Sequence, residues 1–384
     1  MPVGTLHNLA YRALLPLGRS PGNRLSHQHD GRALAHPEVY ERLLRRHHVM
    51  GASLLVRAGG QSAQLFSSLP EKSVAAGSLF RVASITKMTV SAAFLRLQEA
   101  GRLTLDTTAA SLLPAEAAPL GAITLRQLLS HTSGLRDTLA YDSALQRGAP
   151  FSEVLAAPGA IAAKPGETFC YCNFAFGLLG CILEAVTGQT VAAALDTLVL
   201  KPLGMRGTLD ASGLEDSQVV PITRVLARRP QPDTAIPPIG RRPMPAPDPL
   251  RHFGHTAGAL YTDARSLSLL LDALTRLSDF LSGDSVREIC REHAVYGSAS
   301  PTLSYGLGML IIRDPALSEH RILGHQGFAY GCADGAFIEE DTGRQIIFLN
   351  GGCSEARVGR LGLANRDVLR YALRKELPAW KSSP

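Results

Sequence analysis

A serine and a lysine stand three residues apart at the start of a predicted helix, in the tetrapeptide Ser84-Ile85-Thr86-Lys87. Three residues are almost one helical turn, so the two side chains share a face. A serine hydroxyl is a poor nucleophile until a neighbouring group takes its proton, and a partly desolvated lysine can do this. The helix N-terminus adds backbone N–H groups where an oxyanion would form. The same spacing arises often by chance, so the interpretation depends on other segments.

Two further segments support a single site. Tyr171 and Asn173 precede an apolar helix, and at a spacing of two their hydroxyl and amide point to one side. His325 and Gly327 follow a predicted strand in the run GHQGF. Gly327 would let a substrate backbone come close, and the N–H of Phe328 would be a second oxyanion donor. Taken singly, Tyr171 reads as a core aromatic and His325 as an exposed strand-end histidine. The presence of all these residues, in this order along the chain and on these elements, favours a site instead.

The elements that must position these residues are strands near both chain ends and helices between them. Residues 52–66 predict a β-hairpin with a Gly-Gly turn, and residues 84–100 predict a helix ended by a glycine. Residues 103–293 are helical in pattern, whereas residues 306–350 hold several short β-type runs before a last helix over 364–374. The sequence therefore predicts an α/β fold, with an antiparallel sheet flanked by helices and an inserted all-helical domain.

These patterns divide the chain. We expect a mobile N-terminal segment over residues 1–32, an α/β domain from residues 33–102 plus 295–384, and the inserted helical domain over 103–294. Within the inserted helical domain, residues 221–250 are irregular and rich in proline and arginine. A loop of that length in a compact domain is usually functional or disordered. We favour a loop that rims the active site and selects substrates; a surface excursion is the alternative.

Composition excludes several classes of protein. The 384 residues are 45% hydrophobic and 19% charged, which is ordinary for a globular chain. No apolar run reaches the roughly 18–20 residues of a membrane span. The net charge of +6 is not gathered into a basic run, so we expect no nucleic acid partner. The N-terminus has no clear signal-peptide pattern, and a cytoplasmic location is the expectation.

At this point the sequence resembles the serine β-lactamase and penicillin-binding-protein superfamily, nearest its class C β-lactamase, D,D-carboxypeptidase and esterase branch. The resemblance runs from about residue 49 to the last helix. The segments that carry it, in chain order, are FRVASITKMTVSAAFLRLQEAGRLTLD, LRQLLSHTSGL, KPGETFCYCNFAFGLLG, KPLGM, GALYTDARSLSLLLDAL, SYGLGM and GHQGF.

The resemblance implies catalysis through an acyl-enzyme. Ser84 would attack an ester, amide or lactam carbonyl, and Lys87 and Tyr171 would share the work of the general base, with Tyr171 then protonating the leaving group. Which of the two takes the serine proton stays open. Asn173 would orient Lys87 and the acyl side of the substrate. The N–H groups of Ser84 and Phe328 would form the oxyanion hole.

Departures from the family pattern bear on the substrate. β-Lactamases of this superfamily usually carry Lys-Thr/Ser-Gly where this chain has His325-Gln326-Gly327. Histidine is weakly charged at neutral pH and would hold a substrate carboxylate less firmly than lysine, which argues against an efficient β-lactamase. We therefore expect a serine hydrolase of small esters or amides. The alternatives are a D-amino-acid peptidase or amidase, a D,D-carboxypeptidase, a β-lactamase, a penicillin-binding sensor without turnover, and a catalytically dead scaffold.

Other candidate residues have weaker support. His252 and His255 have metal-ligand spacing but no evident third ligand, so we expect no metal and a loop-lining role. Cys170 and Cys172 read as buried small side chains, not ligands, with Cys172 pointing away from the pocket. The run Ser-Gly-Asp-Ser at 282–285 faintly resembles another esterase motif, but we place it in a loop. We expect no cofactor, a small ester, amide or peptide as the partner, and leave the oligomeric state open.

Overall fold

The computed structural model of the protein describes residue 9 and residues 13–17, 23–226, 234, 236–297, 300–329 and 331–381. In that part of the chain the largest element is a nine-stranded sheet with strand order β1-β3-β2-β12-β11-β10-β9-β8-β7. Every neighbouring pair in it is antiparallel. Its strands are β1 (Arg24–Asp30), β2 (Ala52–Ala58), β3 (Gln61–Ser68), β7 (Ala294–Val295), β8 (Leu303–Tyr305), β9 (Leu310–Ile312), β10 (Ile322–Ala329), β11 (Cys332–Glu339) and β12 (Gln345–Asn350).

An early and a late segment of the chain meet inside this sheet. Strand β2 pairs with β12, with Leu54 opposite Phe348. The hairpin β2–β3 turns at Gly59 and Gly60, whose φ values of 56° and 82° lie where glycine is favoured. The predicted hairpin and the predicted late strands are thus present, and they form one sheet.

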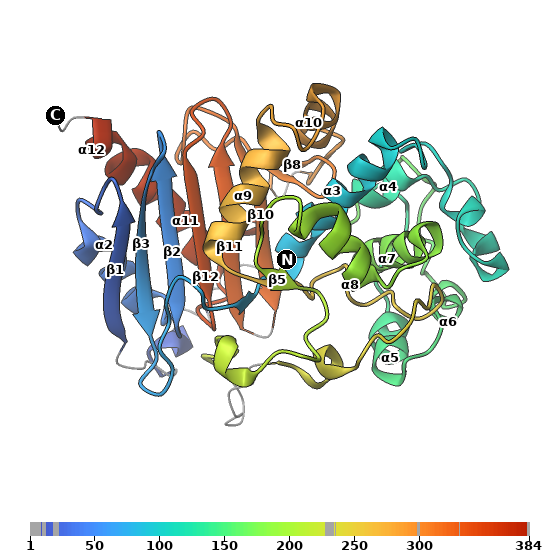
Figure 1. The fold of residues 1–384 in the computed structure, drawn as a ribbon, viewed down its shortest axis with the longest axis horizontal. Coiled ribbons are helices and arrows are strands. Elements are labelled where there is room, and N and C mark those ends of the chain that lie inside the picture. Colours follow the sequence, from blue (N-terminus) through green and yellow to red (C-terminus); the bar gives the residue numbers. More distant parts are fainter. Residues whose placement is uncertain are drawn as a thin grey trace.

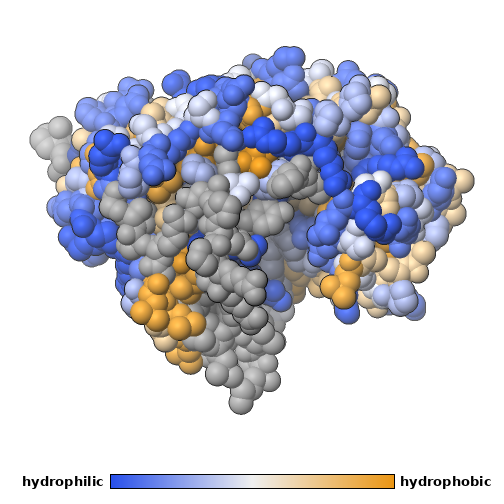
Figure 2. All heavy atoms as spheres, turned by 90° about the horizontal axis from the view of Figure 1, so that it is seen from below, coloured by the Kyte–Doolittle hydropathy of each residue, from blue (hydrophilic) through white to orange (hydrophobic). Residues whose placement is uncertain are grey.

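Helices cover both faces of the sheet (Figure 1). Helix α9 (Ala264–Thr275) packs on β2, β11 and β12, and one large apolar core joins this face to the helical region. Helices α2 (Pro37–Arg46), α11 (Leu363–Tyr371) and α12 (Leu377–Lys381) bury a second core on the other face. Figure 2 shows that the described surface seen from below is mostly hydrophilic, with hydrophobic atoms in separate patches.

The helical region lies beside the sheet, and α3 is its first helix along the chain (Figure 1). A capping box opens α4 at Thr124, since its side chain accepts from the Gln127 backbone and the Gln127 side chain accepts from the Thr124 backbone. The helices are α3 (Thr86–Glu99), α4 (Leu125–Leu129), α5 (Leu139–Arg147), α6 (Phe151–Leu155), α7 (Asn173–Thr187), α8 (Val191–Leu195) and α10 (Gly283–Cys290).

Two small sheets complete the fold. Their strands are β4 (Phe80–Arg81), β5 (Gly207–Thr208) and β6 (Tyr261–Thr262), and β13 (Arg357–Val358) with β14 (Leu361–Gly362). Among the described residues no single helix is long and apolar enough to cross a bilayer, although Asn173–Thr187 and Val191–Leu200 pass that test as a pair bent by 82°.

Three sequence expectations are corrected. Residues 24–30 fall in the segment predicted to be mobile, yet they form β1, paired with β3 over seven positions from Arg24 to Asp30. Most residues earlier in that segment lie outside the described part. Helix α9 falls in the range given to the helical domain, yet it packs on the sheet. Ser282 is not in a loop; its side chain caps α10 by accepting from the Ser285 N–H.

Candidate active site

The candidate nucleophile Ser84 stands on a tight turn, residues 82–86, that leads into α3. Ala83 has a φ of 45°, which is strained for a residue with a Cβ. Side-chain and backbone bonds hold the turn in place. The Thr86 hydroxyl donates to the Ala83 carbonyl at 2.6 Å and accepts from the Leu260 N–H at 3.1 Å, and the Val82 N–H donates to the Leu260 carbonyl at 3.0 Å. The turn therefore presents Ser84 in a fixed position.

Lys87 is completely buried, and its amine has three hydrogen-bond partners. Its Nζ lies 3.1 Å from Ser84 Oγ, 3.0 Å from Asn173 Oδ1 and 2.7 Å from the Ala257 carbonyl oxygen. Burial lowers the pKa of Lys87 to about 7, against the opposing field of Asp137. The predicted Ser84–Lys87 pair is formed, with Asn173 beside it.

The partners of Lys87 fix how its neutral amine would be oriented. The Asn173 amide oxygen and the Ala257 carbonyl oxygen can only accept hydrogen bonds, so they take the two hydrogens of a neutral amine. The nitrogen lone pair is then left for the Ser84 hydroxyl. The arrangement is that of a general base whose pKa lies near neutral pH.

Tyr171 is the third candidate group at the nucleophile. Burial raises the pKa of its phenol far above the usual value, and the neighbouring Ser84 hydroxyl opposes this shift. At neutral pH Tyr171 therefore holds its proton and acts as a donor. The amine of Lys87 stands 5.0 Å from the centre of its ring.

His131, which was not singled out from the sequence, holds the Tyr171 segment. Its Nδ1 accepts from the Cys172 N–H at 3.1 Å, and its carbonyl accepts from the Cys170 N–H at 2.8 Å. Its ring centre lies 4.3 Å from that of Tyr171. Burial keeps the pKa of His131 well below 6.5, so the ring is uncharged and packs as an aromatic. His131 lies within the segment LRQLLSHTSGL, whose resemblance to the family is the only feature of the sequence that could have indicated it.

Asp137 is the second residue that sequence reasoning missed. Its carboxylate accepts from the Asn173 N–H at 3.0 Å, from Asn173 Nδ2 at 3.0 Å and from the Phe174 N–H at 2.9 Å. The Cys172 thiol also donates to it, at 3.3 Å. The bond to Nδ2 turns the amide oxygen of Asn173 towards Lys87. Nothing in the local sequence distinguishes Asp137, because the residues that it holds are about 35 positions away.

His325 is buried, which excludes the alternative of an exposed strand-end histidine. Both ring nitrogens have protein partners: Nδ1 donates to the Gln326 carbonyl at 2.6 Å, and Nε2 accepts from the Tyr305 hydroxyl at 2.8 Å. Burial and the neighbouring Lys87 lower the pKa of His325 to about 3. The imidazole is therefore uncharged, and neither of its nitrogens is left for the predicted contact with a substrate.

Gly327 has a packing role that the sequence did not indicate. A Cβ at this position would lie 2.3 Å from the Val82 carbonyl oxygen and 3.1 Å from the Ala83 Cβ. The glycine thus allows β10 to approach the nucleophile turn, and the predicted approach of a substrate backbone stays a prediction. Phe328, the predicted second oxyanion donor, is half-buried on the same strand, with the Arg357 guanidinium 3.9 Å from its ring centre.

The remaining sequence candidates lie elsewhere. His252 bonds to the buried Glu184 at 2.7 Å, and His255 lines a separate cavity together with the 237–248 part of the proline-rich loop. Residues 227–233 and 235 of that loop lie outside the described residues. Cys172 is buried, as expected, whereas Cys170 is only half-buried. Within the described ranges no three His, Cys, Asp or Glu side chains are grouped to hold a metal ion.

The chain is similar to known proteins over most of its length. The family described as Beta-lactamase matches residues 37–372. Over 370 residues the chain is 28% identical to Esterase EstB of Burkholderia gladioli, an alignment that covers 86% of this chain and 93% of the esterase.

Solved structures show the same fold. EstCE1, a hydrolase with promiscuous acyltransferase activity, matches with a TM-score of 0.71 at 21% identity and covers 87% of this chain and 97% of its own. A D-stereospecific amidohydrolase from Streptomyces sp. matches with a TM-score of 0.65 at 22% identity, over 85% of this chain and 94% of its own. At these identities the likeness concerns the fold alone.

Proposed function

The chain belongs to the Beta-lactamase family, and on that premise we propose that it is a serine hydrolase that cleaves small esters or amides through an acyl-enzyme on Ser84. One observation carries the proposal: the buried Lys87 amine lies between Ser84 Oγ and two oxygen atoms that can only accept. The similarity to an esterase over nearly the full length of both chains supports the ester substrate.

In the first step Ser84 Oγ attacks the substrate carbonyl carbon and its proton moves to the neutral Lys87 amine. The carbonyl π electrons pass to oxygen, which becomes an anion beside the N–H groups of Ser84 and Phe328. We give the base role to Lys87 because its pKa is lowered to about 7, whereas burial raises the pKa of the Tyr171 phenol.

In the second step the bond to the leaving group breaks as the oxyanion reforms the carbonyl. Tyr171 gives its proton to the leaving oxygen or nitrogen, and the Lys87 ammonium returns a proton to Tyr171. Water then attacks the acyl-Ser84 ester with Lys87 again as the base, which releases the acid and restores the serine.

The uncharged His325 argues against efficient cleavage of β-lactams, which carry a carboxylate. Its pKa of about 3 leaves no positive charge at that position near pH 7. We therefore expect rapid turnover of p-nitrophenyl butyrate and little turnover of nitrocefin.

The test measures hydrolysis of p-nitrophenyl acetate and butyrate by the wild type, Ser84→Ala and Ser91→Ala. Ser91 is a matched control, because it is a buried serine on the same helix whose hydroxyl bonds only to the Lys87 carbonyl. We expect Ser84→Ala to lose at least about 10³-fold in kcat/KM, and Ser91→Ala to lose little.

Two parallel substrates separate the alternatives. Faster cleavage of D-alanine p-nitroanilide than of either ester would identify a D-specific peptidase, and fast nitrocefin turnover would identify a β-lactamase. Stoichiometric labelling without turnover would identify a sensor. Unchanged ester hydrolysis in Ser84→Ala would exclude Ser84 as the nucleophile.

A further inference from the structure

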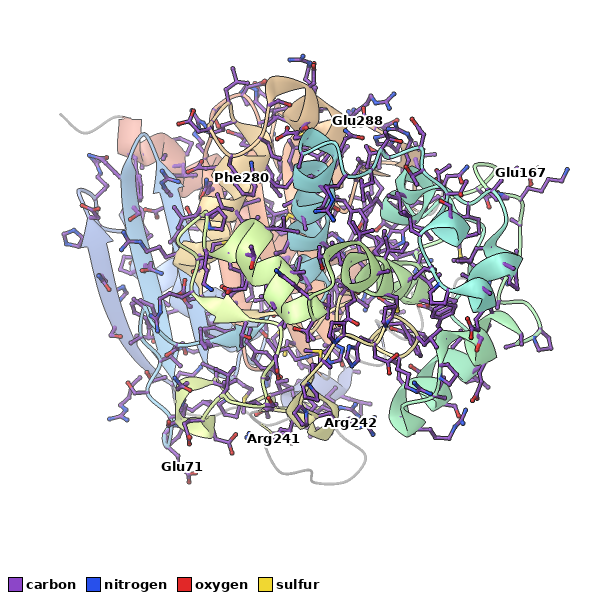
Figure 3. All side chains as sticks on the ribbon, turned by 45° about the vertical axis from the view of Figure 1, so that its right-hand side comes forward. Glu71, Glu167, Arg241, Arg242, Phe280 and Glu288 are labelled. Carbon is purple, nitrogen blue, oxygen red and sulfur yellow. The ribbon has the colours of Figure 1, made fainter. Side chains whose placement is uncertain are left out.

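The nine-stranded sheet ends in two edges of very different length. At one edge lies β7, which has two residues (Ala294–Val295), and at the other lies β1, which has seven (Arg24–Asp30). Strand β1 is the outermost strand on the left in Figure 1 and again in Figure 3, where the molecule is turned by 45°. A short edge offers little backbone to another strand, whereas a long edge is a template for pairing. Strand β1 is therefore the edge to which a further strand can add.

The outer side of β1 is open. Six of its seven residues are exposed, and in the described part of the chain its backbone is hydrogen-bonded to β3 alone. The pairing with β3 runs without a bulge from Arg24, opposite Ser68, to Asp30, opposite Ser62. Natural proteins protect long edges with bulges, prolines or lysines, and none of these is present in RLSHQHD. The outward N–H and C=O groups of the strand are thus left to bond to water or to another chain.

The charges of β1 stand at its two ends. Arg24 is the first residue and Asp30 the last, six positions apart, so both side chains lie on the same face of the strand. No ion pair with a described residue engages either of them, and Arg24 Nη2 reaches the Pro70 carbonyl oxygen only at 3.5 Å. A positive and a negative charge at opposite ends make the strand complementary to an antiparallel copy of itself.

An antiparallel copy of β1, related by a twofold axis at His27, pairs both charges at once. Arg24 then lies opposite the partner's Asp30, and the symmetry repeats this pair at the other end of the strand. Opposite residues of an antiparallel pair have Cβ atoms about 4.5–5.5 Å apart, which allows an ion pair. A parallel copy in register would instead place like charges opposite one another. The inner pairs of the antiparallel arrangement are Ser26 with Gln28, Leu25 with His29, and His27 with its own copy.

We propose that β1 is a self-association surface, through which two copies of the chain form a symmetric dimer whose sheet runs across the twofold axis. Because a single pair of strands buries less area than a standard interface, the dimer should be reversible, with a Kd in the micromolar range. Strand β10, which packs against the nucleophile turn, is separated from β1 by β3, β2, β12 and β11. The dimer therefore does not depend on the hydrolase proposal, and neither result decides the other.

Sedimentation velocity at increasing protein concentration measures the association, and circular dichroism checks that each variant is folded. We expect the wild type to pass reversibly from monomer to dimer. Asp30→Arg places two arginines opposite one another at both ends of the paired strands, and Arg24→Asp places two aspartates there. Each variant alone should therefore associate with itself at least about tenfold more weakly than the wild type does.

A mixture of the two variants distinguishes pairing through β1 from any other contact. In the mixed dimer every arginine again lies opposite an aspartate, so the mixture should associate as tightly as the wild type. Asp284→Arg and Arg287→Asp are the matched controls, because they reverse an exposed ion pair on α10, away from β1 (Figure 1), and they should leave the association unchanged. A mixture that associates no better than its two components would overturn the proposal.

Amide hydrogen exchange of the wild type gives a test that does not depend on how any variant folds. The amides of β1 should exchange more slowly at high protein concentration than at low concentration, whereas those of the short edge strand β7 should exchange at the same rate in both. A wild type that stays monomeric at every concentration would overturn the proposal. A dimer in which the exchange of β1 is unchanged would also overturn it, since the contact would then lie elsewhere.

Discussion

At the scale of single residues, the chemistry depends on the protonation state of one buried amine. Burial disfavours the ammonium form of Lys87, and the charge of Arg81 acts in the same direction. The field of Asp137 opposes them and keeps the pKa at about 7. The amine is thus available as a base near neutral pH without being permanently uncharged.

The first prediction concerns pH. Ester hydrolysis requires neutral Lys87, so kcat/KM should fall as the pH drops through about 7, where the amine gains its proton. Lys87→Arg keeps a cation that does not lose its proton, and should lose about 10²–10⁴-fold with no recovery up to pH 10. Steady-state pH profiles measure both. An acid limb near pH 4–5 in the wild type would contradict the assignment.

The second prediction concerns Asp137 as a positioning residue. Asp137→Asn removes the negative charge that raises the Lys87 pKa, so the acid limb should move to lower pH. The new amide also offers hydrogens to the N–H groups of Asn173 and Phe174, and the misplaced Asn173 should lower kcat by roughly 10²-fold.

Asp142→Asn is the control for this prediction, because Asp142 is an exposed carboxylate on the neighbouring helix α5. Asp142→Asn should change neither the position of the acid limb in the pH profile nor kcat. A drop in kcat for Asp137→Asn with an unmoved acid limb would reduce Asp137 to a purely structural role.

At the scale of elements, strong local signals made the helices and the hairpin predictable. The Gly-Gly turn, the capping box at Thr124 and the N-cap at Asp263 are each present. Strand β1 escaped prediction because its sequence, RLSHQHD, is almost wholly exposed and has no apolar face. It joins the sheet as an edge strand through backbone hydrogen bonds. Such pairing leaves no apolar pattern in the sequence from which it could be predicted.

The third prediction concerns the contact between β10 and the nucleophile turn. Gly327→Ala places a Cβ 2.3 Å from the Val82 carbonyl oxygen, so the strand and the turn must separate. We expect a loss of about 1–3 kcal/mol in unfolding free energy together with reduced ester turnover. Gly213→Ala is the control, because its Cβ would meet no atom within 4 Å and its φ is not positive. Equal stability of the two variants by denaturant titration would contradict this packing.

At the scale of the whole molecule, residues far apart in sequence make up the site. The pair Ser84 and Lys87 and the pair Tyr171 and Asn173 could be found because the members of each pair are close in the sequence. Asp137 and His131 could not, because their partners at 170–174 come close only after folding. The sequence indicated a weakly charged histidine at position 325, but not its burial against Tyr305 and Lys87, which lowers its pKa much further.

The fourth prediction is that the chain unfolds cooperatively, since one apolar core runs from the sheet into the helical region and an early strand, β2, pairs with a late one, β12, in the sheet. Trp380 is the only tryptophan, and it lies in the second core with its indole N–H on Glu376 at 2.9 Å. Its fluorescence and the far-UV circular dichroism should report the same transition. Two separated transitions would show that the helical region and the sheet fold independently.

The central claim, an acyl-enzyme on Ser84, is tested most directly by intact-protein mass spectrometry after rapid acid quenching of the wild type with p-nitrophenyl butyrate. We predict one added butyryl group, located by peptide mapping on the segment that holds Ser84, and no such group in Ser84→Ala. Turnover of the ester by the wild type with no adduct at any quench time, or an equal adduct in Ser84→Ala, would contradict the account.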